Sequence, residues 1–273
     1  MRSTTSGGRQ IHINCAKGDL AGYLLVPGDP DRVPKIASNW DTAKEVAAHR
    51  EFHSCTGKYK GVPISALSSG IGSACMAIAV NEASNIGVHT FIRVGSTGSI
   101  QRGIELGDII ISSAAVRLDC TSNCYVMPEY PAVASHEVLL ALIEAAETLN
   151  IKNYHVGVTA TTADFYAGQS RPTKAAAPYA ENPLPTLQKA GVLNFEMETA
   201  TLYTLASLYG LRAASICAVY ANRCTGEFEM GAGEENAIKA ATEAVKILHE
   251  WDELKKEKRK RWFYPTLLSR KRV

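Results

Sequence analysis

The stretch "HTFIRVGSTGS", residues 89–99, joins a run of apolar residues to a glycine-containing turn. The run up to residue 95 is short and rich in β-branched and aromatic side chains, which predicts a strand buried on both faces. Gly95 and Gly98 then lie among hydroxyl side chains. Because ligands of open α/β sheets collect beyond the carboxyl ends of strands, we expect a binding site at this turn.

The rest of the chain repeats this alternation of short apolar runs and helix-like stretches, which is typical of an α/β protein. Strands are predicted at 22–26, 107–119, 154–162 and 213–220, and further strands lie inside 44–69, joined by a turn near 57–61. Helices are predicted up to residue 38, at 73–87, 135–149 and 234–254, and within 192–206, and residues 168–185 are predicted to form a loop.

The composition narrows the class of protein. With 273 residues, 46% of them hydrophobic, the chain can bury one large core, so we expect a single domain over residues 1–273. It has no apolar run of about 18 residues, so no membrane span is expected. The seven scattered cysteines and the lack of a secretory signal indicate reduced thiols in the cytoplasm. Cys120 and Cys124 have no second ligand pair at zinc-like spacing, so no metal site is predicted.

The positive charge is concentrated in the last 19 residues. From residue 255 onward the chain has nine Lys/Arg and one Glu, which leaves 20 Lys/Arg against 26 Asp/Glu in residues 1–254. An acidic body argues against a nucleic-acid partner, so an anion site inside it must be local. We expect the core to span about residues 12–254 and the basic tail, 255–273, to be solvated or to pack on a neighbouring subunit.

Three arginines lie at or beside turns: Arg32 in "VPGDPDR", Arg50 in "AHREF" and Arg93 in "FIRVGSTGS". A buried arginine needs an anionic partner, which can be an internal carboxylate or a bound oxyanion. The guanidinium fork matches phosphate, and glycine allows the backbone to approach it closely. The Gly-Lys-Ser/Thr ending of a Walker A loop is absent, and "GIGSAC" lacks the third glycine of a dinucleotide fingerprint.

The segment "VLNFEMETATLYTLA", residues 192–206, raises a similar choice. Glu196 and Glu198 flank a methionine at the start of an apolar helix. Acidic side chains are favoured there by the unpaired N–H groups of the first turn, whatever their function. The alternative is that they face a ligand that carries hydroxyl groups, since carboxylates accept hydrogen bonds from a diol.

The motifs "VPGDPDRV", "AAHREF", "FIRVGSTGSIQ", "DFYAGQSR", "NFEMETATL" and "ANR", in this order, resemble the nucleoside phosphorylase family, in particular its members that act on uridine. The resemblance runs from about residue 12 to residue 248. It implies a three-layer αβα sandwich around a central mixed β-sheet. It also implies a homo-oligomer, a dimer or a hexamer built from three dimers, with active sites at the dimer interface.

The resemblance further implies reversible phosphorolysis of uridine to uracil and ribose 1-phosphate, with phosphate as co-substrate and no cofactor. The implied phosphate site consists of Gly28, Arg32, Arg93 and Ser96, with Arg50 from the neighbouring subunit. The implied ribose site consists of Thr97, Met197, Glu198 and a supporting Glu196, with His12 from the same neighbour. The implied base site consists of Phe165, Gln169, Arg171 and Arg223, and Arg93, Gln169, Arg171 and Glu198 would carry the catalysis.

Other activities fit these residues less well. Carboxylates two residues apart at one helix start do not easily flank a glycosidic bond as a glycosidase requires, and a hydrolytic nucleosidase has no need of three arginines. Purine-specific members of the family usually carry an Asp near "YAN", residues 220–222, which this chain lacks. A nucleoside phosphorylase with broader pyrimidine and purine specificity and a non-catalytic nucleoside-binding protein remain the alternatives.

Two departures from the family pattern affect these expectations. Cys75 replaces a serine that in bacterial relatives contributes to a monovalent-cation site with Glu51 and the carbonyl of Ile71. Thiols are poor ligands of hard cations, so no potassium is predicted. Tyr220 is bulkier than the aliphatic residue expected near the base, which raises the question of whether 5-substituted pyrimidines fit.

Overall fold

The computed structural model describes residues 7–174 and 182–268. The serine- and threonine-rich start, part of the predicted loop at 168–185 and the last five residues of the basic tail lie outside the described residues. Within the described ranges no helix has the length and apolarity that a membrane crossing requires. The strands are β1 Tyr23–Val26, β2 Thr42–His49, β3 Phe52–Tyr59, β4 Val62–Leu67, β5 Thr90–Ser99, β6 Ile109–Leu118, β7 Ala132–Val133, β8 Tyr154–Thr162, β9 Asn194–Glu196, β10 Arg212–Asn222 and β11 Glu227–Phe228.

These eleven strands of the described residues form one mixed sheet, in the order β11-β10-β6-β8-β9-β5-β1-β4-β3-β2, with β7 beside β6. β5 also pairs in parallel with β10 over its whole length, so β5, β10, β6, β8 and β9 close into a ring. The strands β1, β4, β3 and β2 extend from this ring as an open sheet. The predicted mixed sheet is confirmed, and its ring closure places the carboxyl end of β5 among three other strands.

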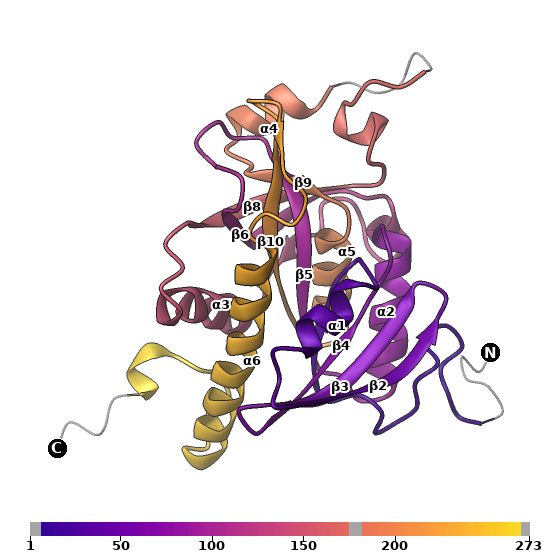
Figure 1. Cartoon of the computed structure of the whole chain (residues 1–273), viewed down its shortest axis with the longest axis vertical. Helices are drawn as coiled ribbons and strands as arrows, with labels where there is room; N and C mark the ends of the chain where they lie inside the picture. The colour runs from indigo at the N-terminus through magenta and orange to yellow at the C-terminus, as the bar shows by residue number, and fades with distance from the viewer. Residues whose placement is uncertain (1–6, 175–181, 269–273) are drawn as a thin grey trace.

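Helices cover the sheet on two sides. The α-helices are α1 Arg32–Ala37, α2 Ser73–Asn85, α3 His136–Thr148, α4 Leu184–Lys189, α5 Thr199–Leu208 and α6 Glu234–Glu257, and the 3-10 helices are η1 Thr121–Cys124, η2 Ala167–Gln169 and η3 Pro265–Leu267. Apolar residues of α1, α3 and α6 share one core cluster, and those of α2 and α5 share a second. In Figure 1, α3 and α6 lie to the left of β5 and α2 and α5 to its right. The fold is the predicted single-domain α/β sandwich.

Two elements near the turns differ from the prediction. β5 continues through the glycine-containing segment to Ser99, because β10 pairs with it beyond Gly95 and β9 pairs with its last two residues. Residues Asn194–Glu196, predicted as the start of a helix, form the short strand β9 between β5 and β8. Glu196 therefore ends a strand, and α5 begins only at Thr199.

Most residues of 255–268 are exposed, as expected of a solvated tail, but two of its side chains pack on the same chain. Phe263 stacks on Trp251 with ring centroids 3.8 Å apart, and both Phe263 and Leu267 are buried in the core cluster of α3 and α6. The carboxylate of Glu137 on α3 accepts from the backbone N–H of Phe263 and from Lys255. The tail thus folds back on its own chain, as the yellow ribbon of Figure 1 shows, and the core extends beyond residue 254.

Candidate active site

Three segments meet at the carboxyl end of β5. Val26 of β1 pairs with Arg93 of β5, so the loop that carries Gly28 follows directly beside Arg93. On the other side, Phe195 of β9 pairs with Gly98, which brings the start of α5 next to the same strand end. The sheet thereby assembles a loop after β1, the end of β5 and a helix N-terminus.

Arg93 is buried, and two of its three nitrogens bind carboxylates of its own chain. Nε donates to Glu196 Oε2 (3.0 Å), and Nη2 lies 2.5 Å from Glu198 Oε2. Burial on its own lowers the pKa of Arg93, but Glu198, Cys217 and Glu196 raise it above the ordinary value. The internal-carboxylate explanation for Arg93 is therefore confirmed for these two nitrogens.

The third nitrogen of Arg93, Nη1, is buried and has no hydrogen-bond partner in the described part of the chain. A Cβ placed on Gly28 would lie 4.0 Å from Nη1 and 3.3 Å from the carbonyl oxygen of Gly70. Gly28 thus lies next to Nη1 without placing a side chain against it. An unpaired buried guanidinium N–H is costly, and a bound oxyanion would satisfy it.

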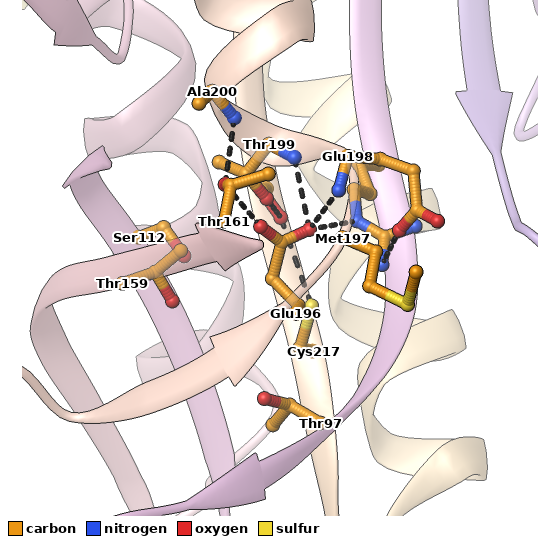
Figure 2. Close-up of polar contacts among 12 residues, drawn as sticks. Thr97, Ser112, Thr159, Thr161, Glu196, Met197, Glu198, Thr199, Ala200 and Cys217 are labelled. Carbon is orange, nitrogen blue, oxygen red and sulfur yellow. Dashed lines mark hydrogen bonds and ion pairs between the residues drawn. The ribbon is translucent and has the colours of Figure 1, made fainter. Parts of the chain in front are cut away.

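Glu196 is the anchor of this cluster. Figure 2 shows its carboxylate reached from several sides: Oε2 accepts from the backbone N–H groups of Glu198 (2.7 Å) and Thr199 (2.9 Å), and Oε1 accepts from the hydroxyl of Thr161. Because Nε of Arg93 also donates to Oε2, all of these contacts lie within the protein. Glu196 thus occupies the helix N-terminus and holds Arg93, which fits the supporting role expected of it beside the sugar.

Glu198 has a different environment. It caps α5, and its Oε1 accepts from the backbone N–H of Gly72 at the start of α2 (2.5 Å). Burial raises the pKa of Glu198 above its ordinary value, although Arg93 opposes the shift. Met197, between the two glutamates, is only partly buried, while its carbonyl accepts from the Ser73 hydroxyl (2.7 Å).

The two hydroxyl residues at the end of β5 are not equivalent. Thr97 is buried, donates to the carbonyl of Phe195 (2.6 Å) and accepts from the side chain of Asn194 (2.7 Å). Ser96 precedes it on the strand and is partly exposed. Successive side chains point to opposite faces of a strand, so the Ser96 and Thr97 side chains lie on opposite faces of β5. Thr97 is therefore tied to β9, whereas Ser96 is more open.

The residues expected to bind a base gather at a second end of the site. Gln169 is buried, its side-chain NH2 donates to Thr162 Oγ1 (3.2 Å), and its backbone carbonyl accepts from Nη1 of Arg223. The guanidinium of Arg171 lies 4.2 Å from the ring centroid of Phe165, and its buried Nε has no partner among residues 7–174 and 182–268.

Arg171 and Arg223 influence each other. Burial lowers the pKa of both side chains, and the charge of Arg171 lowers that of Arg223 further. No ion pair joins either guanidinium to a carboxylate of the described residues. Two neighbouring cations of this kind would be stabilised by negative charge placed between them.

His12 and Arg50 lie on the surface formed by the β2–β3 turn. His12 binds Glu82 of α2 through its ring Nδ1 (2.6 Å), and its carbonyl accepts from the ring of His49 (2.8 Å). Arg50 is exposed, with a φ of 55° in the turn. Within the described ranges no hydrogen bond or ion pair connects His12 or Arg50 with Arg93. A single chain thus does not bring these two residues to the cluster.

Comparison with known proteins identifies the family of the chain. The model of the phosphorylase superfamily matches residues 23–251. The chain belongs to the phosphorylase superfamily. It is 59% identical to a uridine phosphorylase of Thermococcus kodakarensis over 266 residues, which are 97% of this chain and 95% of the relative. It is 40% identical to the uridine phosphorylase of Escherichia coli (87% and 97% covered) and 35% identical to a guanosine phosphorylase of Halorubrum lacusprofundi (84% and 90% covered).

In this member of the phosphorylase superfamily Arg32 lies beside β5, as expected of an anion-site residue. Its Nη1 donates to the carbonyl of Val94 (3.2 Å), and its Nε donates to Glu234 (2.8 Å). Tyr220 was considered as a residue near the base, and its contacts in the structure lie elsewhere. Its hydroxyl points to Arg32 and Glu234, so the side chain lies at the anion end of the site.

The structure adds little that favours a metal. In the described part of the chain no group of three or more His, Cys, Asp or Glu side chains is placed to hold an ion. The thiol of Cys75 donates to Glu51 Oε1 at 3.6 Å, and burial together with Glu51 raises its pKa. That thiol is therefore protonated at neutral pH and remains a poor ligand for a hard cation.

Several residues that build the site were not among the predicted site residues. Thr161, Gly72 and Asn194 bind Glu196, Glu198 and Thr97, respectively, from elements that are distant in sequence. Their types are common in strands and turns. Asn194 lies in the "NFEMETATL" motif and Gly72 in the glycine-containing "GIGSAC", so the sequence offered a signal for these two.

Proposed function

We propose that the chain catalyses the reversible phosphorolysis of uridine to uracil and ribose 1-phosphate. The observation that carries the proposal is the 59% identity, over nearly the whole of both chains, to a protein named uridine phosphorylase. The geometry supports it, because the cluster around Arg93 offers an unpaired buried N–H to an oxyanion and carboxylates to a sugar.

Phosphate would bind between Gly28, Arg32, Nη1 of Arg93 and Ser96. It is already a nucleophile, so the site has to orient and desolvate it, and no catalytic base or covalent enzyme intermediate is needed. The fixed orientation of Arg93 supports this role, because its other two nitrogens are held by carboxylates. We infer that Arg50 of the partner subunit completes the phosphate site.

The ribose would lie on Glu198, Met197 and Thr97, under His12 of the partner subunit. A carboxylate accepts hydrogen bonds from both hydroxyls of a diol. As the bond to the base breaks, positive charge grows on the sugar, and the carboxylates beside Arg93 would stabilise it.

The residues expected to bind the base would stabilise the negative charge that grows on it. Uracil leaves as an anion, and an amide at Gln169 can donate to one atom of its edge and accept from the next. Arg171 and Arg223 have no carboxylate partner among the described residues. Their positive charges would stabilise the negative charge that develops on the uracil. Phe165 would pack on the ring.

A broader specificity is the second candidate, because a guanosine phosphorylase is among the relatives, at 35% identity. Initial rates with uridine, thymidine, inosine, guanosine and adenosine, each with and without phosphate, distinguish these activities. We expect uridine to be cleaved fastest and only with phosphate, yielding ribose 1-phosphate. Turnover that ignores phosphate would indicate a hydrolase, a faster purine would overturn the base site, and no turnover would indicate a binding protein.

We also infer that the active enzyme is an oligomer with shared sites. The exposed Arg50 and the surface position of His12 support this inference. In the test, Arg50→Ala and Glu198→Gln, two variants that we expect to be inactive on their own, are mixed after partial unfolding and refolded together. Mixed dimers that regain activity support sharing between subunits, and mixtures that stay inactive contradict it.

We propose that the enzyme needs no cofactor or metal, that its substrates are small molecules rather than nucleic acid, and that it acts in the cytoplasm. Seven cysteines without disulfides support the last point. Activity that survives exhaustive dialysis against a chelator, with phosphate restored, would support the absence of a metal.

A further inference from the structure

Arg32, Tyr220 and Glu234 form a closed hydrogen-bonded cluster beside the anion end of the site. Nε of Arg32 donates to Glu234 Oε2 (2.8 Å), and its Nη2 donates to the hydroxyl of Tyr220 (3.2 Å). Tyr220 in turn donates to the same oxygen of Glu234. The side chain of Arg32 is only 6% exposed, so these contacts determine where its guanidinium lies.

The count of hydrogens shows what remains for a ligand. Arg32 has five N–H groups, and it uses one from Nε on Glu234, one from Nη1 on the carbonyl of Val94 and one from Nη2 on Tyr220. Among the described residues this leaves one hydrogen on each terminal nitrogen without a partner, so two N–H groups remain that can donate to an oxyanion. Val94 directly follows Arg93, so this pair lies beside the other arginine of the proposed phosphate site.

A β-bulge explains how Tyr220 reaches this position. The pairing of β10 with β5 slips between Val219 and Ala221, so Tyr220 is the extra residue of β10. Bulges change the direction of a side chain next to functional sites. Here the side chain packs against the core cluster of α1 and α6, with its hydroxyl at Arg32.

The position of Glu234 is fixed by the start of α6. Gly233 precedes it with a φ of 70°, and a Cβ there would lie 2.3 Å from the carbonyl oxygen of Gly107, so only glycine fits this contact. Lys35 binds the second oxygen of Glu234 (2.8 Å). Burial on its own raises the pKa of Glu234, but the hydrogen bonds from Lys35, Tyr220 and Arg32 outweigh it and lower the pKa to about 2. Glu234 is therefore an anion at neutral pH.

We propose that Glu234 and Tyr220 are positioning residues for phosphate: they hold Arg32 so that its two free N–H groups face the oxyanion. The inference rests on the proposed phosphorolysis. It assigns to the bulge in β10 and to the first residue of α6 a role in binding the inorganic substrate, although neither residue touches it.

The test compares Glu234→Gln and Tyr220→Phe with a matched pair, Glu243→Gln on the same helix and Tyr59→Phe on β3. Glu243 of α6 is buried and accepts from Tyr59 and Lys60, so it repeats the tyrosine–lysine–glutamate pattern without an arginine. Steady-state kinetics are measured with uridine and inorganic phosphate varied separately. Protection by inorganic phosphate against thermal unfolding is measured in parallel.

We expect Glu234→Gln to raise KM for phosphate about 10-fold and Tyr220→Phe about 3-fold, with KM for uridine within about 2-fold of the parent. In an Arg32→Ala background Glu234→Gln should raise KM for phosphate no further, because its effect acts through Arg32. Glu243→Gln and Tyr59→Phe should leave both KM values unchanged.

Three results would overturn the proposal: an unchanged KM for phosphate in Glu234→Gln, an equal rise of both KM values, or the same rise in Glu243→Gln. If Glu234→Gln does not fold, Tyr220→Phe decides, since it removes only a hydroxyl. A parent enzyme whose turnover ignores phosphate would instead refute the proposed function, so the two failures are distinguishable.

Discussion

Replacing Glu196 by glutamine tests the central cluster with the smallest change of shape. The Glu196 side chain is fully buried and accepts from Arg93 Nε, two backbone N–H groups and the Thr161 hydroxyl. Glutamine keeps the volume but replaces one acceptor oxygen with an NH2 group that faces donors. It also removes one of the two negative charges that compensate Arg93.

The magnitude follows from these contacts. Breaking a buried ion pair by removing one partner costs about 3–5 kcal/mol, and Arg93 keeps Glu198, so we expect about 3 kcal/mol. For a domain somewhat smaller than this chain, 1 kcal/mol lowers Tm by about 2–4 °C, which predicts a decrease of about 10 °C. A guanidinium released from Nε should also lose its orientation, and kcat/KM for phosphate should fall at least 10-fold, or about 1.4 kcal/mol.

The assay combines thermal unfolding with initial rates at varied phosphate. Asp119→Asn is the control, because Asp119 is buried and accepts from Ser122 and Thr201 but binds no arginine of the described residues. It should lower Tm and leave KM for phosphate unchanged. A Glu196→Gln enzyme with the parent Tm and phosphate kinetics would refute the reasoning, and so would an Asp119→Asn enzyme with the same phosphate defect.

Further predictions concern the kinetics of the site and the stability of the fold. Arg93→Ala should damage the use of phosphate more than that of uridine, measured as KM at varied phosphate; kinetics like the parent's would mean that the anion site is misplaced. Gln169→Ala should lower kcat/KM for uridine by roughly 10², because a contact to the leaving group is lost. Phe263→Ala should cost about 3 kcal/mol of stability in a thermal melt, since its buried ring stacks on an indole, while kinetics at 25 °C stay unchanged. Burial on its own raises the pKa of Asp252, but Arg212 lowers it below the ordinary value of 3.8, so its stabilisation is present above that pH and is lost as pH falls further. Melts between pH 5 and 2 should show this loss, and Asp252→Asn should flatten the profile.

Local patterns predicted much of the fold because most elements are buried in the way their sequence indicates. The runs at 22–26, 107–119 and 154–162 are strands within one or two residues of the expected limits, and the helices at 73–87 and 135–149 likewise. Short apolar runs flanked by turn residues and longer runs with helical spacing leave few alternatives.

The errors arise where partners distant in sequence decide the structure. Glycine usually weakens a strand, so the end of β5 was predicted as a turn, yet β10 and β9 supply hydrogen bonds on both sides. Residues 194–196 form a strand because β5 and β8 pair with them on the two sides, which no local sequence pattern shows. The basic run after residue 254 hid the apolar contacts of Phe263 and Leu267, because charge dominates the composition there.

For the site, the family motifs predicted the residues, and only the structure showed how their charges combine. Arg93 had two candidate partners, an internal carboxylate or an oxyanion. Two of its nitrogens bind glutamates, and the third has no partner among the described residues, so an oxyanion there stays a prediction. Glu234 was not predicted, because a glutamate in the first turn of a helix is common and its contact with Arg32 spans about 200 residues.

This division of charge bears on why the enzyme would need a second subunit. Around the proposed phosphate position one chain supplies Arg32 and Arg93, but Glu234, Glu196 and Glu198 already surround these two guanidinium groups. Two cations against three carboxylates leave no excess positive charge for a phosphate dianion, apart from the exposed Lys35. The carboxylates orient the guanidinium donors, but their negative charges also repel a phosphate dianion. A further arginine brought from outside the chain would restore attraction for the anion without loosening that orientation, and Arg50, exposed on the β2–β3 turn, is free to do this for a neighbour.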